Sequence, residues 1–201
     1  SSCTFSNALE LAPEQVAAGT FLRLGVMRTY ATRHGPGPFP THVAGLDTLL
    51  PEPRHPANEW QGDFRRGWLD MVMATYAIEV AGGIDGIALT HLDALERLPD
   101  YRVSVAYRGA WDVTTNLFRR DPGTGHVRAI RSSFDRNLAR QADLTQALAR
   151  ALPVLVDPIS KSSAHDNARR ARDCIEFLTN ALGTSVYLTA NGPRADDVTF
   201  L

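Results

Sequence analysis

The chain of 201 residues is 44% apolar and 21% charged, the balance of an ordinary globular protein that buries a core. Its 21 Lys and Arg side chains nearly cancel its 22 Asp and Glu side chains, and the formal charge of -1 gives no field that would attract nucleic acid or an anionic membrane. No apolar run approaches the roughly 18 residues that span a bilayer, so we expect a cytoplasmic protein without membrane or nucleic-acid partners.

The first part of the chain is expected to hold two helices around a long irregular segment. Residues 9–18 fit a helix, in which a proline is tolerated only near the start. Residues 20–32 fit a strand and a helix equally well, because their apolar positions first alternate and then recur three apart. Dense Pro and Gly forbid regular structure over residues 35–62 apart from one turn, whereas apolar spacing predicts a helix from Gly67 to Gly82.

The second part of the chain alternates expected strands and helices. The apolar residues 87–89 predict a buried parallel strand that ends in Thr-His-Leu-Asp, and residues 103–107 predict a half-buried strand. Apolar spacing predicts helices over 141–152 and 164–182, the second ended by Gly183, with two strands and a Gly-Pro turn after it. We therefore expect the α/β class, with a mostly parallel sheet flanked by helices, and a single region over residues 1–201.

Three places carry candidate chemistry. Asp93 ends a buried strand, where a carboxylate can accept two hydrogen bonds from a donor pair such as N1 and N2 of guanine, although it could instead cap the next helix. Arg65 and Arg66 precede the expected helix at Gly67, where an anion between them would relieve their repulsion from the helix dipole. The alternative is two solvated arginines. The turn "ANGPR", residues 190–194, exposes a Gly backbone that could lie against a flat ligand.

The sequence contains none of the common catalytic signatures. Gly-x-x-x-x-Gly-Lys-Ser/Thr, Gly-x-Ser-x-Gly and paired-His metal motifs are all missing, so no metal ligand and no catalytic residue is assigned. Cys3 and Cys174 lie far apart without metal-ligand spacing, which favours reduced thiols.

Five blocks occur in the order found in one enzyme family: "RTYATRHGPGPFPT" at 28–41, "RRGWLD" at 65–70, "IALTHLDAL" at 87–95, "VAYR" at 105–108 and "ANGPR" at 190–194. On these blocks the chain resembles the C-terminal half of the adenylosuccinate synthetase family. The first block is similar to that family's lysine-alanine-tyrosine and threonine-arginine-valine-glycine signature, and the opening "SSCT" looks like a block from the middle of the family's sequence. We therefore expect a piece of a longer chain.

The resemblance implies a ligase of purine biosynthesis that joins L-aspartate to IMP at the expense of GTP, with Mg²⁺ as cofactor and a homodimer as its assembly. It implies a P-loop-type nucleotide ligase fold, whose phosphate loop and catalytic groups belong to the family's N-terminal half. The present portion alone is accordingly expected to be inactive, and Mg²⁺ is expected to be bound mainly by that other half.

The resemblance also implies site residues. The GTP-binding residues would be His91, Leu92, Asp93, Ala190, Asn191, Gly192 and Arg65, and the IMP-binding residues would be His34, Gly35 and Arg66. Asp93 matches the guanine-binding carboxylate, and residues 190–192 match the segment beside the base. His34 and Gly35 match the valine-glycine pair that lines the IMP ribose.

Two departures from the family leave alternatives open. His91 replaces a lysine whose stem packs on the base, and "EWQGDFRRG" at 59–67 is a contracted form of the aspartate-binding loop without its Thr-Thr pair. A diverged paralogue could therefore join an amino acid to another purine nucleotide, with ATP in place of GTP. A protein that binds nucleotide without catalysis is the third reading.

Overall fold

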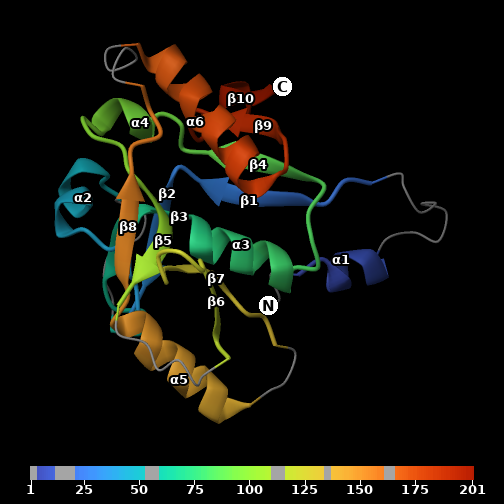
Figure 1. Ribbon diagram of the computed structural model, residues 1–201. Helices are drawn as coiled ribbons and strands as arrows, with labels where there is room; N and C mark the ends of the chain where they lie inside the picture. The colour runs from blue at the N-terminus through green and yellow to red at the C-terminus, as the bar shows by residue number, and fades with distance from the viewer. Residues whose placement is uncertain (1–3, 12–20, 53–58, 110–115, 134–136, 161–165) are drawn as a thin grey trace.

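The described part of the computed structural model comprises residues 4–11, 21–52, 59–109, 116–133, 137–160 and 166–201 (Figure 1). Its helices are α1 (Ser6–Leu11), α2 (Ala44–Leu49), α3 (Met71–Val80), α4 (Ala94–Arg97), α5 (Leu138–Ala149) and α6 (Asn167–Leu182), with the 3₁₀ turn η2 (Ala195–Asp197). Its strands are β1 (Leu24–Arg28), β2 (Tyr30–His34), β3 (Phe64–Asp70), β4 (Gly86–Thr90), β5 (Val103–Arg108), β6 (Phe118–Arg120), β7 (Val127–Ile130), β8 (Leu152–Val156), β9 (Val186–Ala190) and β10 (Val198–Phe200).

The strands form two sheets, which are joined at the step from β1 to β2. Within the described ranges the first sheet has the order β1-β4-β9-β10, in which β1, β4 and β9 are parallel and β10 is antiparallel to β9. The second has the order β2-β3-β5-β7-β6, with β8 also pairing with β5. There only β3 and β5 are parallel, whereas the β2-β3, β5-β7, β5-β8 and β6-β7 pairs are antiparallel.

Helices flank both sheets. The helix α6 packs on β9 and α4, and α3 packs on β5 and β7. In Figure 1, α3 lies below β1 and β4 and above β6 and β7. Amphipathic spacing explains α6, whose buried positions Arg170, Cys174 and Leu178 recur every four residues along one face. This stripe faces the protein interior, so packing as well as local propensity stabilises the helix.

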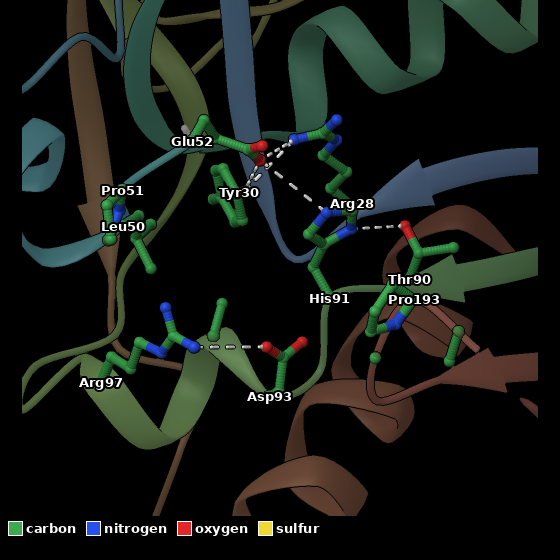
Figure 2. A pocket seen from close by; sticks show the side chains of 13 residues that line it. Arg28, Tyr30, Leu50, Pro51, Glu52, Thr90, His91, Asp93, Arg97 and Pro193 are labelled. Carbon is green, nitrogen blue, oxygen red and sulfur yellow. Dashed lines mark hydrogen bonds and ion pairs between the residues drawn. The ribbon is translucent and has the colours of Figure 1, made fainter. Parts of the chain in front are cut away.

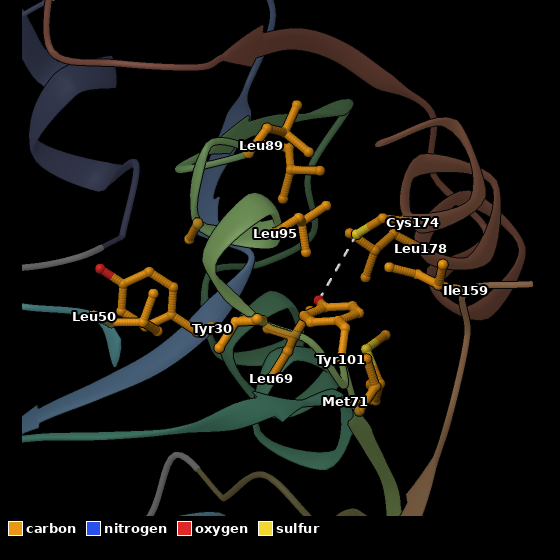
Figure 3. Packing of buried hydrophobic residues seen from close by; sticks show 14 of the residues in the cluster. Tyr30, Leu50, Leu69, Met71, Leu89, Leu95, Tyr101, Ile159, Cys174 and Leu178 are labelled. Carbon is orange, nitrogen blue, oxygen red and sulfur yellow. Dashed lines mark hydrogen bonds between the residues drawn. The ribbon is translucent and has the colours of Figure 1, made fainter. Parts of the chain in front are cut away.

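The main core joins the two sheets to each other. Ile87 of the first sheet and Leu69 and Val103 of the second belong to one buried cluster with Leu178 of α6. Figure 3 shows Tyr101 inside this cluster, with its hydroxyl directed towards Cys174. A second cluster packs α3 and α5 against β5, β6 and β7. Because the first cluster draws on both sheets, its burial stabilises them as one unit.

Several expected elements are confirmed. Strands occur at β4, β5, β9 and β10, the turn expected in the Pro- and Gly-rich segment is the helix α2, and α6 ends at Gly183, whose φ is 63°. Residues 20–32, which fitted two structures equally, form β1 and most of β2. The expected α/β class with helix-flanked sheets is confirmed.

Other expectations are wrong in their details. The sheets are mixed, so the expected mostly parallel arrangement holds only for β1, β4 and β9. The helix expected from Gly67 begins at Met71, because residues 64–70 form β3. The helix expected over 141–152 ends at Ala149 and is followed by β8, and that over 9–18 is α1, with residues 12–18 outside the described part. No helix among the described residues is long and apolar enough to cross a membrane.

Candidate functional site

A pocket of about 450 Å³ lies where β4 and β9 end, beside the step from β1 to β2. Because β4 and β9 are parallel, their carboxyl ends meet at one edge of the sheet, which is where α/β proteins commonly bind ligands. The lining residues, most of them labelled in Figure 2, are Arg28, Tyr30, Leu50, Pro51, Glu52, Thr90, His91, Asp93, Ala94, Arg97, Ala190, Gly192 and Pro193. The pocket therefore combines segments far apart in the sequence.

Asp93 lines this pocket and does not cap the helix that follows it. The residue occupies the N-cap position of α4, but its side chain makes no capping hydrogen bond. Its carboxylate instead lies 3.9 Å from Nη2 of Arg97, in an exposed i,i+4 ion pair. The carboxylate is therefore placed to accept hydrogen bonds from a ligand.

The turn after β9 forms a second wall of the pocket. The backbone N–H of Leu92 donates to the carbonyl of Ala190 at 3.2 Å, and that of Asn191 donates to Asp197 at 3.0 Å. A Cβ on Gly192 would lie 2.5 Å from Oδ2 of Asp197, so a larger residue would have to displace this carboxylate, which accepts from the N–H of Arg194. Ala190 and Gly192 line the pocket, whereas the Leu92 side chain is buried in the core.

Sequence reasoning missed five polar lining residues, which are Arg28, Tyr30, Glu52, Thr90 and Arg97, and three of them form one hydrogen-bonded group. Oε1 of Glu52 accepts hydrogen bonds from Nη1 of Arg28 at 2.7 Å and from the Tyr30 hydroxyl at 2.8 Å. Partial burial opposes the ionisation of Glu52, but these two donors outweigh it and lower the carboxyl pKa. Burial and then the Glu52 carboxylate raise the pKa of Tyr30 to about 12. Arg28 and Tyr30 open the Gly/Pro block and could have been singled out from it, whereas no motif marks Glu52.

His91 has an unusual backbone that is fixed by a neighbour. Its φ of 61° is in the left-handed region, which non-glycine residues seldom adopt. The Thr29 hydroxyl donates to the His91 carbonyl at 2.7 Å and stabilises this conformation. On the ring, Nδ1 lies 3.0 Å from the Thr90 hydroxyl, and burial followed by the Arg28 charge lowers the imidazole pKa.

Arg65, expected at the GTP site, and the residues expected around IMP lie on or beside the antiparallel strands β2 and β3 and do not line this pocket. His34 pairs with Phe64 in the sheet, and its ring packs 4.6 Å from the Phe64 ring. Nη2 of Arg65 donates to the carbonyls of Gly35 and Gly37, at 2.5 and 3.0 Å. Arg65 also borders a second pocket of about 390 Å³, formed by residues 37–40 and the end of α5.

Arg66 is buried, with only 8% of its surface exposed. Its Nη1 donates to the Phe64 carbonyl at 2.9 Å and lies 3.4 Å from Oδ1 of Asp47, and its guanidinium stacks 4.8 Å from the Phe64 ring. The expectation that Arg65 and Arg66 precede a helix is wrong, since both lie within β3. No helix dipole opposes their charges, so that argument for a bound anion fails.

No group of three or more His, Cys, Asp or Glu side chains that could hold a metal ion occurs in the described ranges.

Comparisons with known proteins agree on one family. The family model for adenylosuccinate synthetase matches residues 1–199. The adenylosuccinate synthetase of Caldicellulosiruptor saccharolyticus is 32% identical over 180 residues, which are 87% of this chain and 38% of that protein. That of Aquifex aeolicus is 28% identical over 210 residues, covering all of this chain and 42% of that protein. The chain thus spans about two fifths of the length of these relatives.

A solved structure has the same fold. The fully ligated adenylosuccinate synthetase from Plasmodium falciparum aligns with a TM-score of 0.60 and 22% identity, over 89% of this chain and 40% of that one. Since the family model matches nearly every residue, the chain belongs to the adenylosuccinate synthetase family.

Proposed function

We propose that residues 1–201 form, as a single region, the nucleobase-binding part of a ligase that joins L-aspartate to IMP at the expense of GTP in purine biosynthesis. One observation carries the proposal. Asp93 and the turn that follows β9, which are almost a hundred residues apart in the chain, line the same pocket of about 450 Å³. Its volume lies within the range typical of small-molecule sites.

Guanine would lie between these two walls. Its N1–H and N2–H groups would donate to the carboxylate of Asp93, and its ring would lie against Ala190, Gly192 and Pro193. Asn191 would contribute by its backbone, which fixes the turn through its hydrogen bond to Asp197. Leu92 would act indirectly, because its backbone holds Ala190 in place.

The antiparallel strands β2 and β3 would carry the residues that bind IMP. In this proposal His34 and Gly35 form the wall beside the ribose of IMP, and the buried Arg66 stabilises the pairing of β2 with β3. Arg65 lines the second pocket rather than the first, so any contact that it makes with GTP would involve phosphate and not the base. Its hydrogen bonds to Gly35 and Gly37 hold the Gly/Pro segment in a fixed position, which orients a ligand before reaction.

The reacting groups are proposed to lie outside the described residues. Mg²⁺ neutralises phosphate charge in phosphoryl transfer, and we place most of its ligands in the part of the relatives' length that this chain does not span. A cytoplasmic homodimer completes the proposal.

Turnover by the full-length protein tests the proposal. Phosphate release should require GTP, IMP and L-aspartate together, and omission of any one should abolish it. A protein that binds nucleotide tightly, yet releases no phosphate when all three are present, would instead be a non-catalytic binder.

A substitution tests the role of the base site. Asp93→Asn should raise the KM for GTP by about 5- to 150-fold, equivalent to about 1–3 kcal/mol for an unpaired buried donor, and should leave the KM for IMP nearly unchanged. Asp100→Asn is the matched control, because this exposed carboxylate does not line the pocket. Equal effects of Asp93→Asn on GTP and IMP would refute the assignment.

One observation favours a second candidate. His91 lies in the pocket at the position where the family has a lysine, which permits a paralogue that uses ATP in place of GTP. Parallel assays with GTP and ATP separate the two, since turnover with ATP alone would favour the paralogue.

A further inference from the structure

The pocket contains a second carboxylate, contributed by Glu52 after α2. Only 15% of its side chain is exposed, and its Oε1 accepts hydrogen bonds from both Arg28 and Tyr30. Charge-assisted hydrogen bonds of this kind are short and fix the geometry of the acceptor. Glu52 therefore presents an oriented, ionised acceptor to the pocket.

His91 presents a second acceptor next to Glu52. The Thr90 hydroxyl donates its one proton to the Met27 carbonyl at 3.1 Å, so it accepts a hydrogen bond from Nδ1–H of His91. In the neutral ring this leaves Nε2 as an acceptor. Nε2 lies 3.9 Å from Oε1 of Glu52, so two acceptors lie side by side and no proton of the ring lies between them.

The two acceptor sets lie at different ends of the pocket. Figure 2 shows Glu52, with Arg28, Tyr30 and His91 around it, well apart from the pair formed by Asp93 and Arg97. A guanine nucleoside likewise has two separate sets of donors. Its base donates through N1–H and N2–H, and its ribose donates through two neighbouring hydroxyls that suit two acceptors about 4 Å apart.

We propose that Glu52 and His91 bind the 2′- and 3′-hydroxyls of the nucleotide whose base lies against Asp93, so that this site selects ribonucleotides over deoxyribonucleotides. The inference rests on the proposed function, because it places a guanine nucleotide in this pocket. Each hydroxyl donates its proton to one acceptor, which removes the unfavourable approach of the two acceptors. Arg28 and Tyr30 are positioning residues that hold the Glu52 carboxylate.

Calorimetry on the full-length protein tests this inference with GDP, 2′-deoxy-GDP, 3′-deoxy-GDP and IDP, which lacks the 2-amino group. Each lost hydroxyl should weaken binding by about 5- to 10-fold, as expected for one hydrogen bond between a hydroxyl and an acceptor. Glu52→Gln and His91→Phe should each reduce this preference for ribose while the preference for GDP over IDP remains. Asp93→Asn should have the opposite effect, with loss of the preference for GDP over IDP and retention of the preference for ribose.

A pH series supplies a readout that a merely structural role would not change. Protonated His91 has no acceptor, so the preference for GDP over deoxy-GDP should fall between pH 7.5 and 5 in the unaltered protein and stay constant in His91→Phe. The charged or titratable groups that face this ring are Arg28, Glu52, Asp93 and Tyr30, and the pKa of Glu52 is lowered, away from this window, by its hydrogen bonds from Tyr30 and Arg28.

The outcomes separate the two proposals. Equal binding of GDP and both deoxy-GDP compounds, with GDP preferred over IDP, would overturn the ribose site and leave the proposed function standing. An unchanged preference for ribose in both Glu52→Gln and His91→Phe would also overturn it. Failure of GDP to bind at all would overturn both.

Discussion

At the scale of single residues, Asp70 shows how one buried carboxylate organises its surroundings. The residue is 4% exposed, and its Oδ1 accepts hydrogen bonds from the backbone N–H groups of Val72 and Met73 at the start of α3. Its Oδ2 accepts a short hydrogen bond of 2.5 Å from the Tyr107 hydroxyl. Burial dominates over these three donors and raises the pKa of Asp70 to about 6.

The raised pKa predicts a defined dependence of stability on pH. Because the folded protein holds this proton more tightly than the unfolded chain does, Asp70 adds stability at low pH that is lost as the pH rises from about 4 through 6. The free energy of unfolding of the unaltered protein, minus that of Asp70→Asn, should therefore fall over this window and stay constant above pH 7. Urea unfolding at pH 4.5, 5.5, 6.5 and 7.5 measures it. A difference that rises with pH would contradict the prediction.

Tyr107→Phe provides a companion measurement. Loss of the hydroxyl should raise the pKa of Asp70 further, and it should cost about 1–3 kcal/mol at pH 8, where the carboxylate is ionised. The cost should be smaller at pH 5.

The candidate site was predictable from the sequence only where a motif marked it. Asp93 and the turn at 190–192 followed strands, and the structure places them at one pocket. Glu52 lies in a segment without periodicity or motif, and it enters the pocket through tertiary hydrogen bonds to Arg28 and Tyr30 that no local pattern encodes. Arg65 was grouped with Asp93 by resemblance, and the structure places it on another element.

At the scale of elements, the Gly/Pro segment is held by one arginine of β3. Arg65 donates to the carbonyls of Gly35 and Gly37, and its guanidinium lies 5.6 Å from the centre of the Phe39 ring. The N–H of Gly35 in turn donates to Asp63 at 3.0 Å. The rigidity of this segment therefore comes from β3 as well as from its own prolines.

Arg65→Ala should loosen this segment. We expect faster hydrogen exchange of backbone amides over residues 35–42 and a higher KM for IMP or for the amino acid, because the wall beside the ligand is no longer fixed. Exchange measured by mass spectrometry on the full-length protein checks this. Arg102→Ala is the matched control, as this exposed arginine directly precedes β5 and none of the described contacts joins it to residues 35–42. Unchanged exchange in Arg65→Ala would return Arg65 to a solvated surface role.

The element boundaries predicted from the sequence were wrong where apolar spacing continued from one element into the next. Trp68 and Leu69 of β3 directly precede the apolar residues of α3 and continue their spacing, so helical periodicity was extended back into β3. The signal that marks the true helix start is Asp70, a preferred N-cap residue whose side chain accepts from the first turn. The strand β8 was missed because Leu152 also continued the spacing of α5, and its strand structure depends on pairing with β5, far away in sequence.

At the scale of the whole molecule, one core connects both sheets with α4 and α6. Leu178 of α6 is fully buried in the cluster that also contains Leu89 of β4 and Val103 of β5. Arg170, one of the few buried charged residues in the described part, donates to the carbonyls of Leu95 and Leu98 and so ties α6 to α4. The two sheets should therefore unfold together.

Leu178→Ala tests this cooperativity. The change should cost about 2–5 kcal/mol through the cavity it leaves, and unfolding should remain a single transition by fluorescence and circular dichroism. Leu138→Ala, at a position that is 78% exposed, should change the free energy of unfolding by less than about 0.5 kcal/mol. Two separate transitions would show that the sheets are independent.

Thr29 is the one residue between β1 of the first sheet and β2 of the second, and it is completely buried. Its N–H donates to Thr90, its hydroxyl donates to His91, and its carbonyl accepts from the Tyr101 hydroxyl. Arg28 and Tyr30, on either side of it, both line the pocket. Because the two sheets meet at this residue, a rotation of one sheet against the other would change the width of the pocket, and a ligand held there would in turn favour one angle between the sheets.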